Sequence, residues 1–135
     1  MKGFQAITDG DKRAAAAQVL QSVTLVRADQ VRNFLRYICD MELAGRGNEL
    51  SEYLVGVEAL GRPAGYSTAD DSSVRRRAYA LRQKLEEVYR EELSTAEIRI
   101  EVPKGGYLPR FVRTSELAAR EPIAATRVVA LERTA

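Results

Sequence analysis

A change of hydrophobic period after residue 92 constrains the fold more than any other feature of the sequence. Before it, apolar residues recur at spacings of four and three, which predicts a stripe along one side of a helix. The stripe consists of Val74, Ala78, Leu81, Leu85 and Val88. After it, Ile98, Ile100 and Val102 alternate with Arg99, Glu101 and Pro103, a period of two that predicts a half-buried strand. The chain is therefore expected to combine helices with a β-structure near its C-terminal end.

The residues after that strand predict a β-hairpin over 98–111. Lys104-Gly105-Gly106 supplies the turn, because glycine accepts positive φ without a steric penalty. Tyr107, Leu108 and Phe111 are expected to form the returning strand. Pro109 lacks an N–H group and confines that strand to an edge position.

Three shorter helices are predicted before the long one. The first covers residues 11–23 and contains four consecutive alanines. The second covers residues 29–43, with Asp29 as its N-cap and Gly45 and Gly47 ending it. The third covers residues 49–60. Its expected inner residues are Leu50, Tyr53, Leu54, Val57 and Leu60.

Gly56 and the start of the long helix give further local expectations. A glycine costs about 1 kcal/mol inside a helix, so Gly56 predicts close packing against a neighbour. The long helix should begin near Asp70, and Thr68 with Asp71 resembles a capping box. A short helix is expected at 115–120, and residues 128–131 form an apolar segment that could pack, pair or remain free.

Composition excludes several chemistries. The chain has no histidine, which removes Ser-His nucleophiles and histidine metal ligands. Its single cysteine, Cys39, permits neither an intrachain disulfide nor a cysteine zinc site and is expected to be buried. No apolar run approaches the roughly 18 residues that span a bilayer. We therefore expect a cytoplasmic, nucleoid-associated protein without catalytic activity, metal or cofactor, with no membrane partner and no evident small-molecule substrate.

The first half of the long helix carries an unbalanced charge. Residues 72–84 hold five positive charges and no negative one, although the whole chain has a net charge of only +2. At 100° per residue, the face opposite the apolar stripe carries Ser72, Arg76, Tyr79 and Gln83. A major groove about 12 Å wide admits one helix, and arginine can bind guanine bidentately.

This pattern predicts contacts to double-stranded DNA. Base contacts are expected from Ser72, Ser73, Arg76 and Tyr79. Phosphate contacts are expected from Arg75, Arg77, Arg82 and Lys84. Arg77 lies close to the apolar stripe and could instead pack its stem and pair with a carboxylate. Asp71 is assigned to helix capping.

The alternative is a solvated helix face stabilised by internal ion pairs. The acids that could form such pairs cluster in the C-terminal half of the helix: Glu86, Glu87, Glu91 and Glu92. The helix macrodipole favours the reverse order, with acids first and bases last. Groove binding is therefore the preferred interpretation.

The hairpin extends the predicted interface. Its tip would touch the DNA backbone or the minor groove through Lys104, Gly105 and Arg110. The alternative is a hairpin that only covers the helical core. A basic helix followed by a basic-tipped hairpin predicts a winged helix-turn-helix.

Residues 16–111 resemble a bacterial winged-helix family, found as a transcriptional-regulator-like N-terminal domain before TPR, β-propeller or cyclase modules. The matching segments are Val31-Arg-Asn-Phe-Leu-Arg-Tyr37, Leu43-Ala-Gly-Arg-Gly47, Glu52-Tyr-Leu-Val-Gly-Val-Glu58, Gly61-Arg-Pro63, Asp71-Ser-Ser-Val-Arg75, Leu81-Arg-Gln-Lys-Leu85 and Pro103-Lys-Gly-Gly-Tyr107. The hairpin is also similar to the wing of response-regulator output domains. This resemblance implies that residues 71–84 form the recognition helix and residues 103–107 the wing.

These observations together define one expected organisation. The fold class is mainly α with a C-terminal β-hairpin (α+β), arranged as a winged helix-turn-helix. Residues 1–10 are a flexible N-terminus and residues 11–113 the DNA-binding domain. Residues 114–135 are a tail, partly flexible or a short oligomerisation or interaction segment. The chain ends soon after the domain, which is expected for a stand-alone regulator or for a fragment of a larger one.

The expected function is sequence-specific binding of double-stranded DNA in transcription regulation, with a homodimer possible at a palindromic site. The alternative is a helical protein–protein interaction module within a regulatory or nucleoprotein complex. In that case the apolar stripe of the long helix, or residues 128–131, would dock a partner. A nuclease is disfavoured because no positioned nucleophile or metal cluster is evident.

Overall fold

The computed structural model describes residues 6–120, which form a mainly helical structure with a two-stranded antiparallel hairpin after the helices. The α-helices are α1 (Asp9–Leu20), α2 (Val23–Val26), α3 (Asp29–Leu43), α4 (Glu52–Leu54), α5 (Ser73–Glu91) and α6 (Thr114–Arg120). A 3₁₀ turn, η1 (Gly47–Glu49), precedes α4, and a π-helical turn, η2 (Val55–Ala59), follows it. The strands are β1 (Ile98–Glu101) and β2 (Arg110–Arg113).

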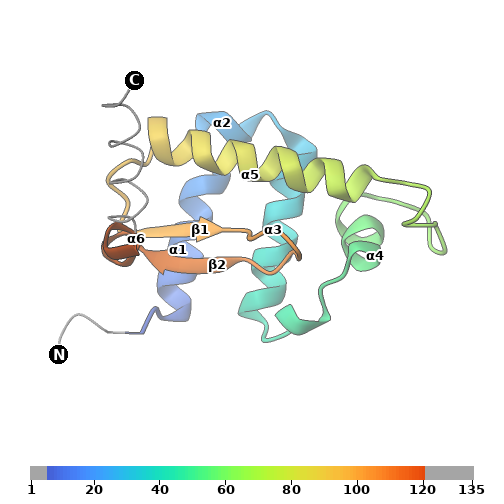
Figure 1. Ribbon diagram of the computed structural model, residues 1–135, viewed down its shortest axis with the longest axis horizontal. Helices are drawn as coiled ribbons and strands as arrows, with labels where there is room; N and C mark the ends of the chain where they lie inside the picture. Colours follow the sequence, from blue (N-terminus) through green and yellow to red (C-terminus); the bar gives the residue numbers. More distant parts are fainter. Residues whose placement is uncertain (1–5, 121–135) are drawn as a thin grey trace, which may run out of the picture.

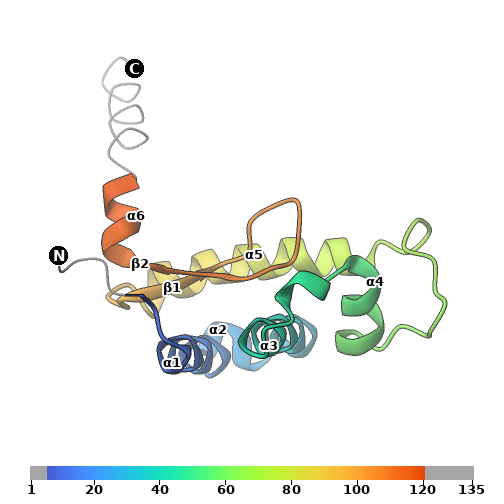
Figure 2. The ribbon, with the colours of Figure 1, turned by 90° about the horizontal axis from the view of Figure 1, so that it is seen from below.

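The elements form two layers. Helices α1, α2 and α3 make one layer, and α5 with the hairpin makes the other (Figures 1 and 2). The predicted second helix and α3 have the same bounds, and the helix predicted at 115–120 is confirmed as part of α6. None of the helices within residues 6–120 is long and apolar enough to cross a lipid bilayer. The apolar segment at 128–131 lies outside the described residues.

Three predicted details at helix ends are wrong, and a local hydrogen bond accounts for the first and the third. The first helix ends at Leu20 rather than residue 23, since the Ser22 hydroxyl accepts the N–H of Leu25 and starts α2. Asp29 is the first residue of α3, and its N-cap is Ala28, which has no capping side chain. The long helix begins at Ser73 because the Asp71 carboxylate, rather than Thr68, accepts a backbone N–H at its start.

The third predicted helix has a different form and a different inner side. A 3₁₀ turn (η1), a short α-helix (α4) and a π-turn (η2) lie within residues 47–59, so the side chains do not follow the period of one continuous α-helix. Val55 is fully buried, whereas Tyr53 is 38% exposed. The expectation that Tyr53 lies on the inner side is therefore wrong.

The hairpin has a longer loop than predicted. Ile98 pairs with Arg113 and Glu101 with Arg110, so residues 102–109 form the loop and Tyr107 and Leu108 lie outside the returning strand. Pro103 and Pro109 lie near the two ends of this loop, and neither can donate the N–H that would extend the ladder. Gly105 adopts a φ of 94°, as expected for a turn glycine.

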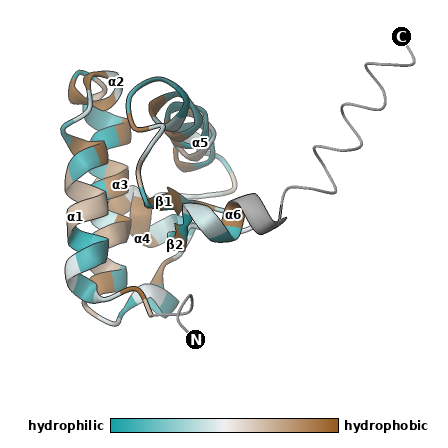
Figure 3. Ribbon diagram, turned by 90° about the vertical axis from the view of Figure 1, so that its left-hand side faces the viewer, coloured by the Kyte–Doolittle hydropathy of each residue, from teal (hydrophilic) through white to brown (hydrophobic). Residues whose placement is uncertain are grey.

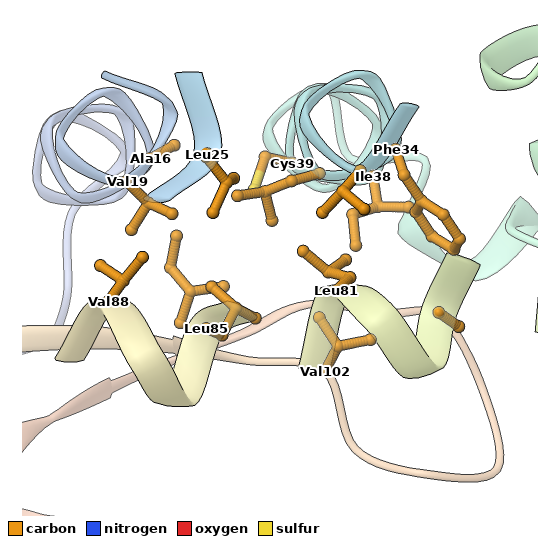
Figure 4. Packing of buried hydrophobic residues seen from close by; sticks show 14 of the residues in the cluster. Ala16, Val19, Leu25, Phe34, Ile38, Cys39, Leu81, Leu85, Val88 and Val102 are labelled. Atoms are coloured by element: carbon orange, nitrogen blue, oxygen red, sulfur yellow. The ribbon is translucent and has the colours of Figure 1, made fainter. Parts of the chain in front are cut away.

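The core lies between the two layers. Figure 4 shows side chains of α1, α2 and α3, including Val19, Leu25 and Phe34, facing Leu81, Leu85 and Val88 of α5. The whole predicted stripe of α5 is buried. The stripe is therefore not exposed to a partner, and the other segment named in the protein-interaction alternative, residues 128–131, lies outside the described residues.

Burial makes two core groups difficult to ionise. Cys39 is 1% exposed, and its burial raises the pKa of the thiol to about 12 from 9.0. Burial likewise raises the pKa of Tyr89 to about 12 from 10.0, and its hydroxyl accepts the backbone N–H of Ile100 at 2.9 Å. Both groups are therefore neutral in the folded protein well above neutral pH.

We expect the free energy of unfolding to fall as the pH rises from 9 to 12. In this interval the Cys39 thiol and the Tyr89 hydroxyl lose their protons in the unfolded chain before they do so in the folded protein. Once a group is charged in the unfolded chain, it lowers the free energy of unfolding by about 1.4 kcal/mol for each further pH unit. Urea unfolding at several pH values measures this slope. The Cys39→Ala variant should show a shallower fall, and an identical slope in the two proteins would contradict the assignment.

Gly56 lies in η2 against Tyr66, which confirms the predicted close packing. A Cβ atom at residue 56 would lie 2.0 Å from the Tyr66 hydroxyl oxygen and 2.5 Å from the ring carbon that bears it. Tyr66 donates a 3.0 Å hydrogen bond to the Glu52 carbonyl and stacks on Tyr53 with 5.5 Å between ring centroids. This contact attaches the segment at 61–72 to α4 and η2 just before α5 begins.

The Gly56→Ala variant is expected to be less stable by about 1–3 kcal/mol, because overpacking outweighs the better helix propensity of alanine. Denaturant unfolding measures the difference. Gly10→Ala is the matched control, since the nearest atom to its Cβ would be the Thr8 hydroxyl at 3.7 Å. Equal stability of the Gly56→Ala variant and the wild type would show that Tyr66 moves away without cost.

Candidate nucleic-acid interface

The outer face of α5 presents polar and aromatic side chains to solvent. Ser72, Arg76, Tyr79 and Gln83 lie opposite the buried stripe. Tyr79 is 63% exposed, and Arg76 and Gln83 are also exposed. The Arg76 guanidinium donates to the Ser72 hydroxyl one turn earlier. Figure 3 views α5 nearly end-on and shows hydrophilic colour on it.

The start of α5 is fixed by Asp71. Its Oδ1 atom accepts the backbone N–H of Ser73 at 2.8 Å, and its Oδ2 atom forms an ion pair with Arg62 at 3.1 Å. Ser73, through its side chain and its N–H, and then Arg62 hold the pKa of Asp71 at about 2. Asp71 therefore caps the helix as a carboxylate at neutral pH, and the Ser73 hydroxyl next to it is buried.

Arg75 and Arg77 lie on opposite flanks of α5 and contact other elements. Arg75 forms an ion pair with the Glu52 carboxylate of α4 and donates a 3.1 Å hydrogen bond to the Thr68 carbonyl. Arg77 donates a long hydrogen bond of 3.5 Å to the side-chain oxygen of Gln30 in α3. Arg75 thus holds the beginning of α5 against α4 and the preceding loop.

Arg82 connects α5 to the hairpin loop, residues 102–109. Its Nε atom donates to the Val102 carbonyl at 2.6 Å. Its Nη2 atom donates to the carbonyls of Pro103 at 3.3 Å and Gly106 at 3.0 Å. One guanidinium therefore binds three backbone oxygens and fixes the loop beside the helix.

The hairpin loop lies on the same side of the molecule as α5, away from α1, α2 and α3 (Figure 2). Lys104, Gly105 and Arg110 are exposed. Tyr107 anchors the loop from below, with its ring centroid 6.0 Å from that of Phe34 in α3. The loop thus has an exposed cationic tip, Lys104, and a half-buried aromatic base, Tyr107.

The structure divides the residues predicted to bind DNA into two groups. Within the described part of the chain, one group has neither a carboxylate within 4.0 Å nor a side-chain hydrogen bond to another element: the exposed Arg76, Lys104 and Arg110, with the half-buried Lys84. Tyr79, Ser72 and Gly105 accompany this group on the same surface. In the other group, Arg75, Arg77 and Arg82 bind other elements through their side chains, and the Ser73 hydroxyl is buried.

Two features were missed by sequence reasoning. Gln83 was left out of the predicted contacts, although the helical wheel already placed it beside Arg76 and Tyr79. The attachment of Arg82 to the hairpin has no signal in the sequence, because its acceptors are backbone carbonyls that any residue carries. Within residues 6–120 no group of three or more histidine, cysteine, aspartate or glutamate side chains is arranged to hold a metal ion.

No family model matches this chain, and no match was found among curated proteins or among solved structures. The functional argument therefore depends on the surface formed by α5 and the hairpin.

Proposed function

We propose that the chain is a winged helix-turn-helix domain that binds double-stranded DNA sequence-specifically and acts in transcription regulation. The observation that carries this proposal is the shared surface of α5 and the hairpin loop. Arg82 joins the two elements, and their exposed cations Arg76, Lys104 and Arg110 have no carboxylate partner in the described residues. In this proposal α5 is the recognition helix and the hairpin is the wing.

The outer face of α5 has the side chains that base readout requires. Arginine can bind the two acceptors of guanine, glutamine can bind adenine, and an apolar ring can contact the thymine methyl group. Arg76, Gln83 and Tyr79 supply these three chemistries within two helical turns. Lys84, Lys104 and Arg110 would contact phosphates on either side.

The connection before α5 differs from a compact helix-turn-helix. That motif joins its helices by a turn of about three to four residues, whereas residues 60–72 separate η2 from α5 here. The Arg75–Glu52 and Arg62–Asp71 ion pairs and the Tyr66 contact hold α5 against α4. These contacts perform the positioning that a short turn would otherwise provide.

Fluorescence anisotropy tests the proposal. A labelled fragment from upstream of the protein's own gene is titrated at two salt concentrations beside a scrambled duplex. If about four to six phosphates are contacted, log affinity should fall with log salt at a slope near −4 to −5. Tighter binding to the native fragment at both salts supports the proposal. Absence of binding at low salt contradicts it.

The Lys104→Ala variant is expected to bind every duplex more weakly by a similar factor. A phosphate contact carries no sequence information, so the salt slope should become shallower by about 1 while the preference for the native fragment stays the same. Arg36→Ala is the matched control, because Arg36 is exposed on α3 in the opposite layer. A change of sequence preference in Lys104→Ala would contradict a purely phosphate role.

A further inference from the structure

A second surface feature lies beside the proposed DNA interface. An open groove of about 800 Å³ runs between the C-terminal half of α5, β1, the hairpin loop and the first turns of α6. Small-molecule sites in proteins commonly have volumes of about 300–1,000 Å³. The groove is therefore large enough for a small organic ligand.

The groove combines an apolar floor with a cationic edge. Its apolar lining comes from Leu85, Tyr89, Ile100, Val102 and Leu117. Its charged lining consists of five cations, Arg82, Arg90, Arg99, Lys104 and Arg110, and two carboxylates, Glu86 and Glu101. This excess of positive charge next to apolar surface is complementary to an anion that carries an apolar body.

Arg99 gives the groove a fixed cation. Its guanidinium lies 5.2 Å from the centroid of the Tyr89 ring, which holds it by a cation–π contact. Its Nη2 atom donates only a long hydrogen bond of 3.5 Å to the Ser94 carbonyl. Its Nε atom is buried and has no hydrogen-bond partner. The guanidinium is thus held in place while much of its donor capacity is unused.

We propose that this groove binds a small amphiphilic anion, a carboxylate, sulfonate or phosphate attached to an apolar body, and that binding weakens DNA binding. The effect on DNA binding, but not the ligand site itself, rests on the proposed function. A DNA phosphate chain is a poorer occupant, because it has no apolar body to cover the apolar floor of the groove.

Arg82 provides the physical link between the groove and the DNA surface. It lines the groove and also binds three carbonyls of the hairpin loop. An anion in the groove competes with those neutral acceptors, because hydrogen bonds between charged groups are stronger. It also neutralises Lys104 and Arg110, which line the groove and belong to the DNA surface. Ligand and DNA therefore oppose each other, and each lowers the affinity of the other by the same factor.

The binding half is tested with 8-anilinonaphthalene-1-sulfonate, an amphiphilic anion, in a titration followed by two-dimensional ¹H–¹⁵N NMR. We expect saturable chemical shift changes confined to residues of the groove, and much weaker effects from inorganic phosphate, which lacks the apolar body.

The Arg99→Gln variant should bind the probe roughly tenfold more weakly. Arg90→Gln, at an exposed position of α5, should weaken binding severalfold, and the Arg36→Gln control should leave it unchanged. Equal affinity of Arg99→Gln, Arg90→Gln and wild type, or shifts spread over the whole molecule, would overturn the site.

The regulatory half is tested by repeating the DNA titration with the probe at saturation. We expect a severalfold loss of DNA affinity in the wild type and a smaller loss in Arg99→Gln at the same probe concentration, because the variant is less fully occupied. Unchanged DNA affinity with an occupied groove would overturn the proposed effect on DNA binding, but the groove would remain a ligand site. Failure to bind DNA without any probe would count against the proposed function alone, since the NMR titration contains no DNA.

Discussion

The Arg82→Ala variant is expected to lose affinity for every duplex by roughly tenfold or more, with native and scrambled DNA affected alike. Without the guanidinium, the carbonyls of Val102, Pro103 and Gly106 lose their shared donor and the hairpin loop becomes free to move. The loop must then be ordered again when DNA binds, which costs affinity. Anisotropy titrations of the two duplexes measure the loss.

The Arg82→Lys variant distinguishes two roles of Arg82: holding the hairpin loop by hydrogen bonds, and supplying a positive charge. Lysine keeps the positive charge but cannot bridge several carbonyls with a planar group. If Arg82 acts by holding the loop, the lysine variant resembles the alanine variant, and amide exchange in residues 102–109 accelerates in both. A lysine variant with wild-type affinity and exchange would show that Arg82 contributes only a charge.

The Arg76→Ala variant is expected to lose sequence preference rather than general affinity. A bidentate contact to guanine contributes about 1–3 kcal/mol of discrimination, so affinity for the native fragment should fall about 10- to 100-fold. Affinity for a scrambled duplex should change far less. The ratio of the two dissociation constants, measured at one salt concentration, gives the result.

Arg77→Ala is the comparison for Arg76→Ala. It removes the same charge from the adjacent residue, which lies on the α3 side of the helix near Gln30. We expect a small and uniform loss of affinity in that variant. A similar loss of preference in the two variants would mean that total charge, rather than a base contact, determines selectivity.

The sequence predicted the parts of the fold that depend on periodicity. Helix α3 and the buried stripe of α5 follow from apolar residues at spacings of three and four. The hairpin follows from alternation and from the glycines of its loop. These elements have repeated local signals, so the position of one side chain has little influence on the prediction.

The details that could not be predicted depend on single hydrogen bonds or on distant partners. Ser22 starts α2 through one hydroxyl, and the π-turn at Val55–Ala59 changes which side chains point inward. Arg75 finds its carboxylate at Glu52, 23 residues away in the chain. The adjacent arginines 75, 76 and 77 are all exposed, and only the fold shows that their partners differ. Arg75 pairs with the Glu52 carboxylate, Arg76 with the Ser72 hydroxyl and Arg77 with the Gln30 side chain.

The burial of Cys39 has a consequence for redox chemistry. It is the one cysteine of the chain, it lies in the core between α3 and α5, and burial holds its thiol in the neutral form. Oxidants and alkylating reagents attack the thiolate at an accessible sulfur, so neither condition is met in the folded state. The surface formed by α5 and the hairpin contains no sulfur that such reagents could modify. The proposed DNA binding should therefore be insensitive to oxidants.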